Sequence, residues 1–235
     1  MITCSVCQTE NDEYATVCGK CKSFIQNRIS NLDFFDTVWK VIESPHRAFH
    51  DITLSDHKNY ALLMFTFFGI GLSFTGFWYY QLGSRFESLL EILGRGTLYG
   101  VVLGYVCAIL FTGLFHGISR LLGGKGGIRN SLGVLGYATT PVALSLITIL
   151  PIELLTFGMY MFTANPHPYT IKPELYVTLV AVDGALGLWA LALGVVGTKV
   201  SKQMSYSRSF FSIVSAASCS FGVLAVASRW FMQHV

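Results

Sequence analysis

The sequence predicts an all-α polytopic membrane protein, in which a five-transmembrane-helix bundle follows a small zinc ribbon and an amphipathic surface helix. Three observations support this fold class. Of the 235 residues, 52% are hydrophobic and only 12% are charged, whereas soluble domains carry about 25% charged residues. Five stretches are long and apolar enough to cross a bilayer, and four N-terminal cysteines have metal-site spacing. We expect three parts, at residues 1–25, 26–59 and 60–235.

The first part carries two Cys-x-x-Cys pairs, Cys4 with Cys7 and Cys18 with Cys21. Two such pairs can bring four thiolates to a tetrahedral Zn²⁺ ion, and Gly19 suits the backbone of the second turn. A segment this short cannot build its own core, so metal binding would supply most of its folding energy. Two disulfides are the alternative. A four-cysteine site leaves no coordination position open, so we expect the zinc to be structural.

The second part is polar, but it carries apolar side chains at helical spacing. These are Phe34, Phe35, Val38, Trp39 and Ile42 and, after Pro45, Phe49, Ile52 and Leu54. An amphipathic helix of this kind either lies on the membrane surface or packs against the cytosolic ends of the spans. The pattern leaves both arrangements open.

Five apolar segments follow, and each is long enough to cross a bilayer. They are residues 60–80, 97–119, 141–163, 175–197 and 210–228. Between the first two, residues 81–96 are expected to form a short amphipathic helix on the outer surface.

The third span cannot be one straight helix from residue 131 to residue 163. Such a helix would be roughly 50 Å long, against a hydrocarbon core of roughly 30 Å. An interior proline removes a backbone donor and biases the preceding residue out of the α region. We therefore expect a break at Pro141, with residues 131–140 as a short interfacial or re-entrant piece.

The lysine and arginine residues predict the orientation of the chain. If the N-terminus lies in the cytoplasm, twelve of the sixteen fall in inner segments and four in outer segments. Cytoplasmic loops carry the excess of these residues in membrane proteins. We therefore expect a cytosolic N-terminus and zinc ribbon, and an extracytoplasmic C-terminus.

Glu153 and Asp183 are acidic residues inside the third and fourth predicted spans. Counted from the outer ends at about 1.5 Å per residue, both lie roughly 12–15 Å deep, so they could face each other. A carboxylate inside the membrane is costly, which makes the pair a candidate polar site for an ion, a proton or a lipid head group. Alternatively, each carboxyl group is neutral or bonded to a neighbouring hydroxyl and only locks helices together.

Small residues in the second and fourth spans predict close helix packing, without chemistry of their own. They are Gly100, Gly104, Gly113, Gly117, Gly184, Gly187, Gly194 and Gly197. We expect each of them to let a neighbouring helix backbone approach.

The central stretch carries a family resemblance. Gly136, Tyr137 and Pro141, in the run Gly-Tyr-Ala-Thr-Thr-Pro, resemble the Gly-Tyr-x-x-x-Pro signature of the Yip family, the Rab/Ypt-GTPase-interacting membrane proteins. Pro45 before the first span, with the phenylalanine and isoleucine that follow it, is similar to the Pro-x3-Phe-x2-Ile run of prokaryotic members. The resemblance covers about residues 34–230 and implies five spans with the N-terminus inside.

The resemblance implies a role in membrane organisation or trafficking. Glu43-Ser44-Pro45 stands where eukaryotic members carry Asp-Leu-Tyr-Gly-Pro, so binding of small GTPases is not carried over. The N-terminal segment separately resembles zinc ribbons that precede bacterial membrane domains, which implies a protein of the bacterial cytoplasmic membrane.

The chain contains neither a His-Glu-x-x-His helix nor a Gly-x-Ser-x-Gly elbow, and we assign no catalytic residue. We expect a non-catalytic scaffold or transporter-accessory protein. It would contact the lipid bilayer and a membrane or cytosolic protein partner but no nucleic acid, and the bundle could form a homo-oligomer. The alternative is a permease or channel for an ion, proton or lipid that uses Glu153 and Asp183.

Overall fold

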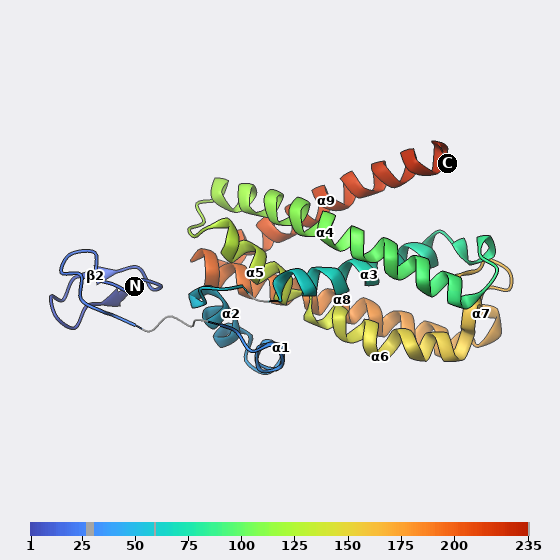
Figure 1. Ribbon diagram of the computed structural model, residues 1–235, viewed down its shortest axis with the longest axis horizontal. Helices are drawn as coiled ribbons and strands as arrows, with labels where there is room; N and C mark the ends of the chain where they lie inside the picture. Colours follow the sequence, from blue (N-terminus) through green and yellow to red (C-terminus); the bar gives the residue numbers. More distant parts are fainter. Residues whose placement is uncertain (27–30, 59, 235) are drawn as a thin grey trace.

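The computed structural model describes residues 1–26, 31–58 and 60–234, with side chains described as far as residue 226. Two short antiparallel strands, β1 (Ile2–Thr3) and β2 (Glu10–Asn11), form an N-terminal ribbon. Long helices lie side by side as a bundle, and the ribbon lies beyond one end of it (Figure 1). The helical elements are α1 (Phe34–Glu43), α2 (Pro45–Leu54), α3 (Ala61–Tyr79), η1 (Leu82–Arg85), α4 (Leu89–Leu121), α5 (Ile128–Ala138), α6 (Thr140–Phe157), η2 (Gly158–Phe162), α7 (Pro168–Ile171), α8 (Pro173–Lys202) and α9 (Tyr206–His234).

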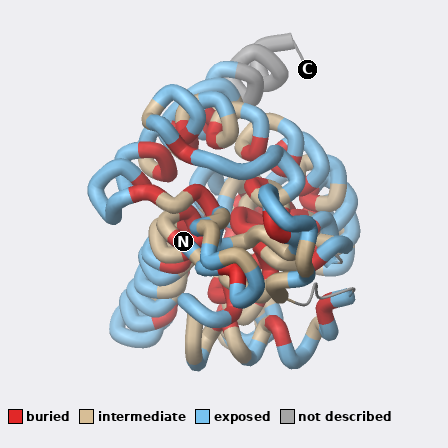
Figure 2. The backbone as a smooth tube through the Cα atoms, turned by 90° about the vertical axis from the view of Figure 1, so that its left-hand side faces the viewer, coloured by how far each residue is buried: buried red, intermediate tan, exposed pale blue. Residues whose placement is uncertain are grey.

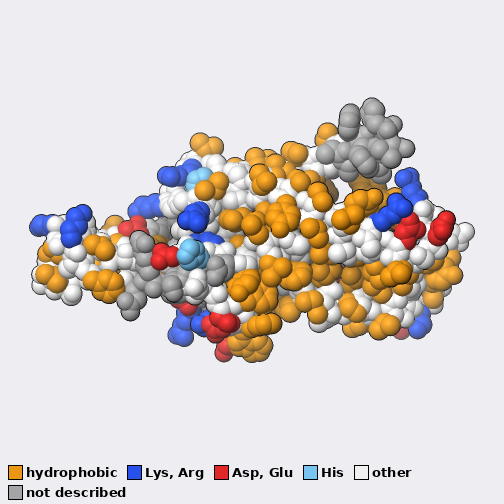
Figure 3. All heavy atoms as spheres, viewed as in Figure 1, with side chains coloured by type: hydrophobic (Ala, Val, Ile, Leu, Met, Phe, Trp, Pro, Cys, Tyr) orange, Lys and Arg blue, Asp and Glu red, His pale blue; other side chains and the backbone are white. Residues whose placement is uncertain are grey.

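Five helical segments of the described chain are long and apolar enough to cross a membrane, as predicted. They are Ala61–Tyr79, Leu89–Leu121, Ile128–Phe162, Pro173–Lys202 and Tyr206–Val226. On the face that Figure 3 shows, hydrophobic side chains cover the middle of the bundle and charged side chains gather toward its two ends. Seen from the ribbon end, buried and exposed residues alternate along the helices (Figure 2). The fold is therefore an all-α bundle of an integral membrane protein.

The third span breaks where the sequence predicts. Helix α5 ends at Ala138 and α6 begins at Thr140, so that Pro141 occupies the first turn of a new helix, where its missing N–H costs nothing. Most residues of α5 from Ser131 onward are buried, because the helix packs against α2, α3, α4 and α8. The short piece therefore lies in the interior of the protein at the ribbon end.

The amphipathic segment forms two helices, separated at Ser44. The Asp33 side chain caps α1 by accepting a hydrogen bond from the backbone N–H of Asp36 at 2.9 Å. Helix α2 packs against the bundle and buries Phe49 and Ile52 completely. On α1, in contrast, Phe35 is 81% exposed and Trp39 is 64% exposed. Helix α2 thus packs on the ends of the spans, while α1 keeps an apolar edge open.

The prediction of a separate surface helix at residues 81–96 is wrong. Only the short η1 lies there, and residues from 89 onward are the first turns of α4. The Ser88 hydroxyl caps this helix by accepting from the N–H of Glu91 at 3.2 Å, and Glu91 pairs with Arg95 at 2.7 Å. The residues from 89 onward are therefore continuous with the second span and do not form a separate helix.

Close glycine packing is confirmed for part of the predicted set. A Cβ atom on Gly104 would lie 2.5 Å from the Phe65 carbonyl oxygen, and one on Gly100 would lie 2.4 Å from the Ile70 Cα atom. A Cβ atom on Gly197 would lie 2.6 Å from the Val134 side chain, and one on Gly194 would lie 3.4 Å from the Ile213 side chain, so these two glycines meet side chains and not a backbone. A Cβ atom on the other four would meet no described atom within 4 Å; these are Gly113, Gly117, Gly184 and Gly187. The small-residue spacing therefore identifies the α3–α4 contact but overstates the packing of the rest.

We expect Gly104→Val to destabilise the bundle, because its side chain would overlap the backbone of α3. Overpacking of this kind costs about 1–3 kcal/mol or more. Thermal unfolding of the purified protein in detergent measures the loss. Gly113→Val is the matched control, since the same change on the same helix meets open space; equal destabilisation by both variants would contradict the α3–α4 contact.

Candidate metal centre and intramembrane carboxylates

The two Cys-x-x-Cys pairs fold into two turns of the same design. The N–H of Gln8 donates to the Cys4 carbonyl oxygen at 2.9 Å, and the N–H of Lys22 donates to the Cys18 carbonyl oxygen at 3.1 Å. Gln8 and Lys22, each directly after the second cysteine of a pair, have φ of 56° and 60°. In each turn the left-handed residue is therefore the one directly after the second cysteine, and Gly19 does not have a positive φ.

The two turns bring four sulfur atoms together. All four lie within 4.8 Å of one another, with 3.6 Å from Cys4 Sγ to Cys21 Sγ and 3.5 Å from Cys7 Sγ to Cys18 Sγ. A disulfide bond is about 2.05 Å long, so these pairs are not disulfides. A tetrahedral ion with metal–sulfur bonds of about 2.3 Å would space its ligands about 3.8 Å apart. The sulfur atoms are therefore placed where they could hold one metal ion.

The surroundings of Cys4 favour its thiolate form. The Ser23 hydroxyl lies 3.0 Å from Cys4 Sγ and 2.9 Å from Cys21 Sγ. Hydrogen bonds from Ser23 and from the backbone N–H groups of Cys7 and Val6 lower the pKa of Cys4 to about 6. Cys4 and Cys18 are buried, whereas Cys21 is exposed. Because thiolates are the form that binds metal, this environment suits a cation held by four cysteines.

The ribbon contacts the membrane bundle through specific polar groups. The Tyr14 hydroxyl donates to the backbone carbonyl oxygen of Val200 on α8 at 2.6 Å, and its ring lies 5.3 Å from the His50 ring on α2. The Gln203 side chain, just after α8, donates to Asp12 at 3.1 Å. Burial of the tyrosine raises its pKa well above the ordinary value, so the hydroxyl remains a donor. The cysteine ribbon is thus attached at the end of α8.

The structure places the two intramembrane carboxylates at different levels. The Ser145 hydroxyl on α6 donates to Asp183 on α8, and Ser145 lies eight residues before Glu153. At about 1.5 Å per residue, this spacing corresponds to about 12 Å along α6. The expected common depth is therefore wrong. The physical reason is that α6 ends at Phe157, and the short η2 turn that follows does not continue its rise.

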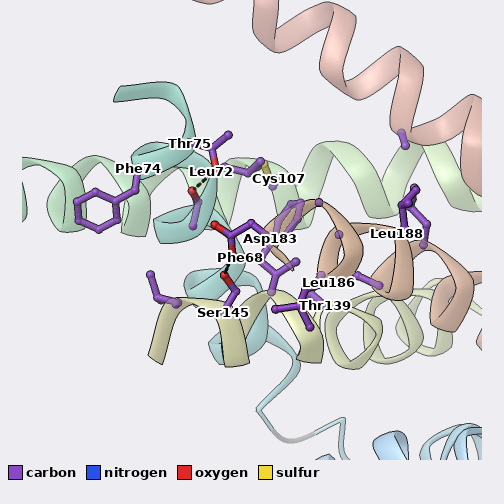
Figure 4. A pocket seen from close by; sticks show the side chains of 18 of the residues that line it. Phe68, Leu72, Phe74, Thr75, Cys107, Thr139, Ser145, Asp183, Leu186 and Leu188 are labelled. Atoms are coloured by element: carbon purple, nitrogen blue, oxygen red, sulfur yellow. Dashed lines mark hydrogen bonds between the residues drawn. The ribbon is translucent and has the colours of Figure 1, made fainter. Parts of the chain in front are cut away.

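The two carboxylates also differ in their hydrogen bonds. Asp183 is half-buried and bonded to a neighbouring hydroxyl, as in the packing alternative. Glu153 is only 4% exposed, and its Oε1 atom has no hydrogen-bond partner among the described residues. Both side chains line one cavity within the bundle, and Figure 4 shows Asp183 and Ser145 turned toward each other on its wall.

The residues of the family motif have structural positions at the junction of α5 and α6. Tyr137 is completely buried, and a Cβ atom on Gly136 would lie 2.8 Å from the Ala61 carbonyl oxygen. Pro141 begins α6 and is buried. The motif therefore sets the close contact of α5 with the start of α3 and the direction of α6.

A buried lysine was not recognised from the sequence. Lys202 was counted among the inner charges, yet it is only 1% exposed. Its Nζ atom lies 3.2 Å from His116 Nδ1, which in turn lies 3.2 Å from the Ser131 hydroxyl. No carboxylate pairs with Lys202 among the described residues. In the sequence, Lys202 lies near other charged residues of the inner segments, and nothing in the pattern marks it as buried.

The model of one protein family, described as Yip1 domain, matches residues 39–228 of the chain. The match covers the bundle from within α1 to α9 and leaves the ribbon outside. Searches of curated proteins and of solved structures found no match.

We expect Tyr14→Phe to loosen the ribbon from α8, because it removes the hydrogen bond to Val200 and leaves a buried carbonyl oxygen without that donor. A bond of this kind contributes about 1 kcal/mol, or roughly a fivefold change in the docking equilibrium. Energy transfer between a dye on the N-terminus and one at position 125 measures the docked fraction. Tyr169→Phe, at the exposed α7, is the control; unchanged transfer in Tyr14→Phe would contradict the attachment.

Proposed function

The chain belongs to the Yip1 domain family, and from this premise we propose that it is a non-catalytic membrane scaffold that docks a protein partner. The five-span bundle would anchor the molecule in the bilayer. The ribbon, with α1 and α2 beside it, would bind a membrane or cytosolic protein such as a transporter. The proposal includes the residue assignment, with Cys4, Cys7, Cys18 and Cys21 as ligands of a structural zinc ion.

One observation carries this proposal: the ribbon is attached to the bundle by specific polar contacts and still leaves several apolar side chains exposed. Tyr14 and Asp12 attach it to α8 and the residue that follows. Val6 is 71% exposed and Phe24 is 62% exposed, although a unit this small has few apolar residues to leave in water. Such side chains are typical of a surface that a partner covers.

The zinc ion would close the ribbon, since the two short strands and their turns have almost no core. It would supply structure and no chemistry of its own, because four cysteines leave no open coordination position. The four thiolates would hold the two turns together, and the Ser23 hydroxyl lies within 3.0 Å of two of the sulfur atoms, where it can donate to one of them.

We further propose that the ribbon end faces the cytosol of a bacterial cell. The segment before α3, the loops between α4 and α5 and between α8 and α9, and the helix ends beside these loops carry twelve of the sixteen lysine and arginine residues. They lie at one end of the bundle, as the Tyr14–Val200 bond and the bond from the Lys125 N–H to the Lys202 carbonyl oxygen support. An excess of cationic side chains at one end favours the cytoplasmic side, where thiols stay reduced.

A permease or channel is the second candidate, because Glu153 and Asp183 line the same cavity. We rank it lower, since the cavity wall is almost entirely apolar and would present few groups to a hydrated ion. Proteoliposome flux measurements test it. The permease requires pH-dependent flux that Glu153→Gln or Asp183→Asn abolishes, and equal flux in wild type and both variants would eliminate it.

We expect Cys18→Ser to release the metal and to abolish partner co-purification, while the bundle still inserts. Zinc content is measured by elemental mass spectrometry and partner recovery by quantitative pulldown from native membranes. Cys219→Ser is the control, since this exposed cysteine lies on α9, away from the four sulfur atoms.

A second variant separates docking from folding of the ribbon. Phe24→Ser should keep the metal but lose the partner, because Phe24 is exposed and lies outside the four-cysteine cluster. Recovery of the partner by either Cys18→Ser or Phe24→Ser at the wild-type level would refute the docking role.

A further inference from the structure

The bundle contains a cavity of about 700 Å³ among α3, α4, α6, α8 and α9. Its wall is formed largely by leucine, phenylalanine and other apolar side chains, of which Figure 4 labels Phe68, Leu72 and Leu186. Cavities of this volume and polarity are typical of sites for small apolar ligands. Because the cavity lies within the membrane-spanning part, the molecules around it that could enter are lipids.

A small number of polar groups on the wall lack partners. Glu153 is 4% exposed, and its Oε1 atom has no hydrogen-bond partner among the described residues. Ser220 on α9 is 8% exposed, and its hydroxyl oxygen also has no hydrogen-bond partner among the described residues. Buried polar atoms without partners are rare in native proteins, and a bound ligand is one way to satisfy them.

The electrostatic character of the cavity is one-sided. Its wall carries two carboxyl groups, those of Glu153 and Asp183, and no lysine, arginine or histidine occurs among the described lining residues. Asp183 already accepts a hydrogen bond from Ser145. Glu153 therefore remains as an acceptor without a donor, in a place where an unpaired carboxylate is costly.

The cavity has an opening toward the surroundings on the side of α8 and α9. Two of its lining residues are largely exposed, Leu188 at 69% and Phe221 at 72%. Gly184 and Gly187 line the same side, and a Cβ atom on either would meet no described atom within 4 Å. Figure 1 shows α9 leaning away from the rest of the bundle. A molecule in the hydrocarbon layer thus has a lateral path to the cavity.

We propose that this cavity binds a lipid with a primary ammonium head group, whose N–H groups donate to Glu153 while its apolar chain fills the cavity. A cation that donates hydrogen bonds satisfies both the charge and the free acceptor atom. An anionic head group would find no cationic partner at Glu153, and a quaternary ammonium would bring charge without a donor. The assignment is independent of partner docking by the ribbon.

The test uses the full-length protein in nanodiscs of phosphatidylcholine that contain phosphatidylethanolamine. The two lipids differ at the nitrogen atom, which carries three N–H bonds in one and three methyl groups in the other. Native mass spectrometry measures which lipid stays bound after release from the nanodisc. We expect retained phosphatidylethanolamine, and Glu153→Gln should lower its occupancy by about tenfold, since a charge-assisted hydrogen bond is lost.

Two controls separate this site from general lipid contact. Glu174→Gln removes a carboxylate from the exposed first turn of α8 and should leave the retained lipid unchanged. Gly187→Leu fills open space at the cavity and should displace the lipid without unfolding the bundle, whereas Gly113→Leu adds the same volume to a glycine outside the cavity and should not.

Two results would overturn the proposal. Equal retention of phosphatidylcholine and phosphatidylethanolamine would show that the ammonium donor is not recognised. If diacylglycerol and phosphatidylethanolamine compete and are retained at equal occupancy, a neutral hydroxyl donor suffices and the charge has no role.

Discussion

The constraint on which this structure depends is that a polar group inside the bilayer must find its partner within the protein. The chain meets it first by folding its apolar segments into helices, which satisfy their own backbone groups. Side chains follow the same rule: Thr66 and Thr75 on α3 donate to carbonyl oxygens one turn earlier, and Asp183 accepts from Ser145. Six buried side-chain oxygen atoms of the described residues are exceptions, and among these six the Oε1 atom of Glu153 is the one that belongs to a carboxyl group. It lies on the wall of a cavity. Where a structure departs from a rule it otherwise follows, a function is the natural place to look.

The same constraint explains how the bundle and the ribbon are joined. The break before Pro141 buries α5 at one end of the bundle, where it packs against α2 and α8. The end of α8 then offers the Val200 carbonyl oxygen to Tyr14 of the ribbon. The small four-cysteine ribbon thereby gains a fixed position on a membrane protein through few contacts. In the proposed function, the ribbon held at this position, with α1 and α2 beside it, is the part of the molecule that docks a partner.

Much of the fold could be predicted from the sequence, because hydropathy and proline act locally. The five spans, the break before Pro141 and the division of the amphipathic segment at Ser44 follow from such local rules. The features that could not be predicted depend on contacts between parts of the chain that are far apart in the sequence. Counting residues from the span ends placed Glu153 and Asp183 at one depth, since it assumed straight helices of full length. Small-residue spacing could not tell Gly104, which meets α3, from Gly187, which meets no described atom, because spacing does not say which helix lies opposite. The attachment of Tyr14 to Val200 joins residues far apart in the chain and left no local pattern.

The central claim is that the bundle crosses the membrane five times, with the cysteine ribbon in the cytosol. The most direct measurement attaches reporters to both ends of the full chain in a bacterial host. One reporter fluoresces only in the cytosol, and the other is an enzyme active only outside it. The account predicts signal from the cytosolic reporter at the N-terminus and from the outer enzyme at the C-terminus. Activity of the same reporter at both ends would contradict it, because an odd number of crossings cannot leave both ends on one side.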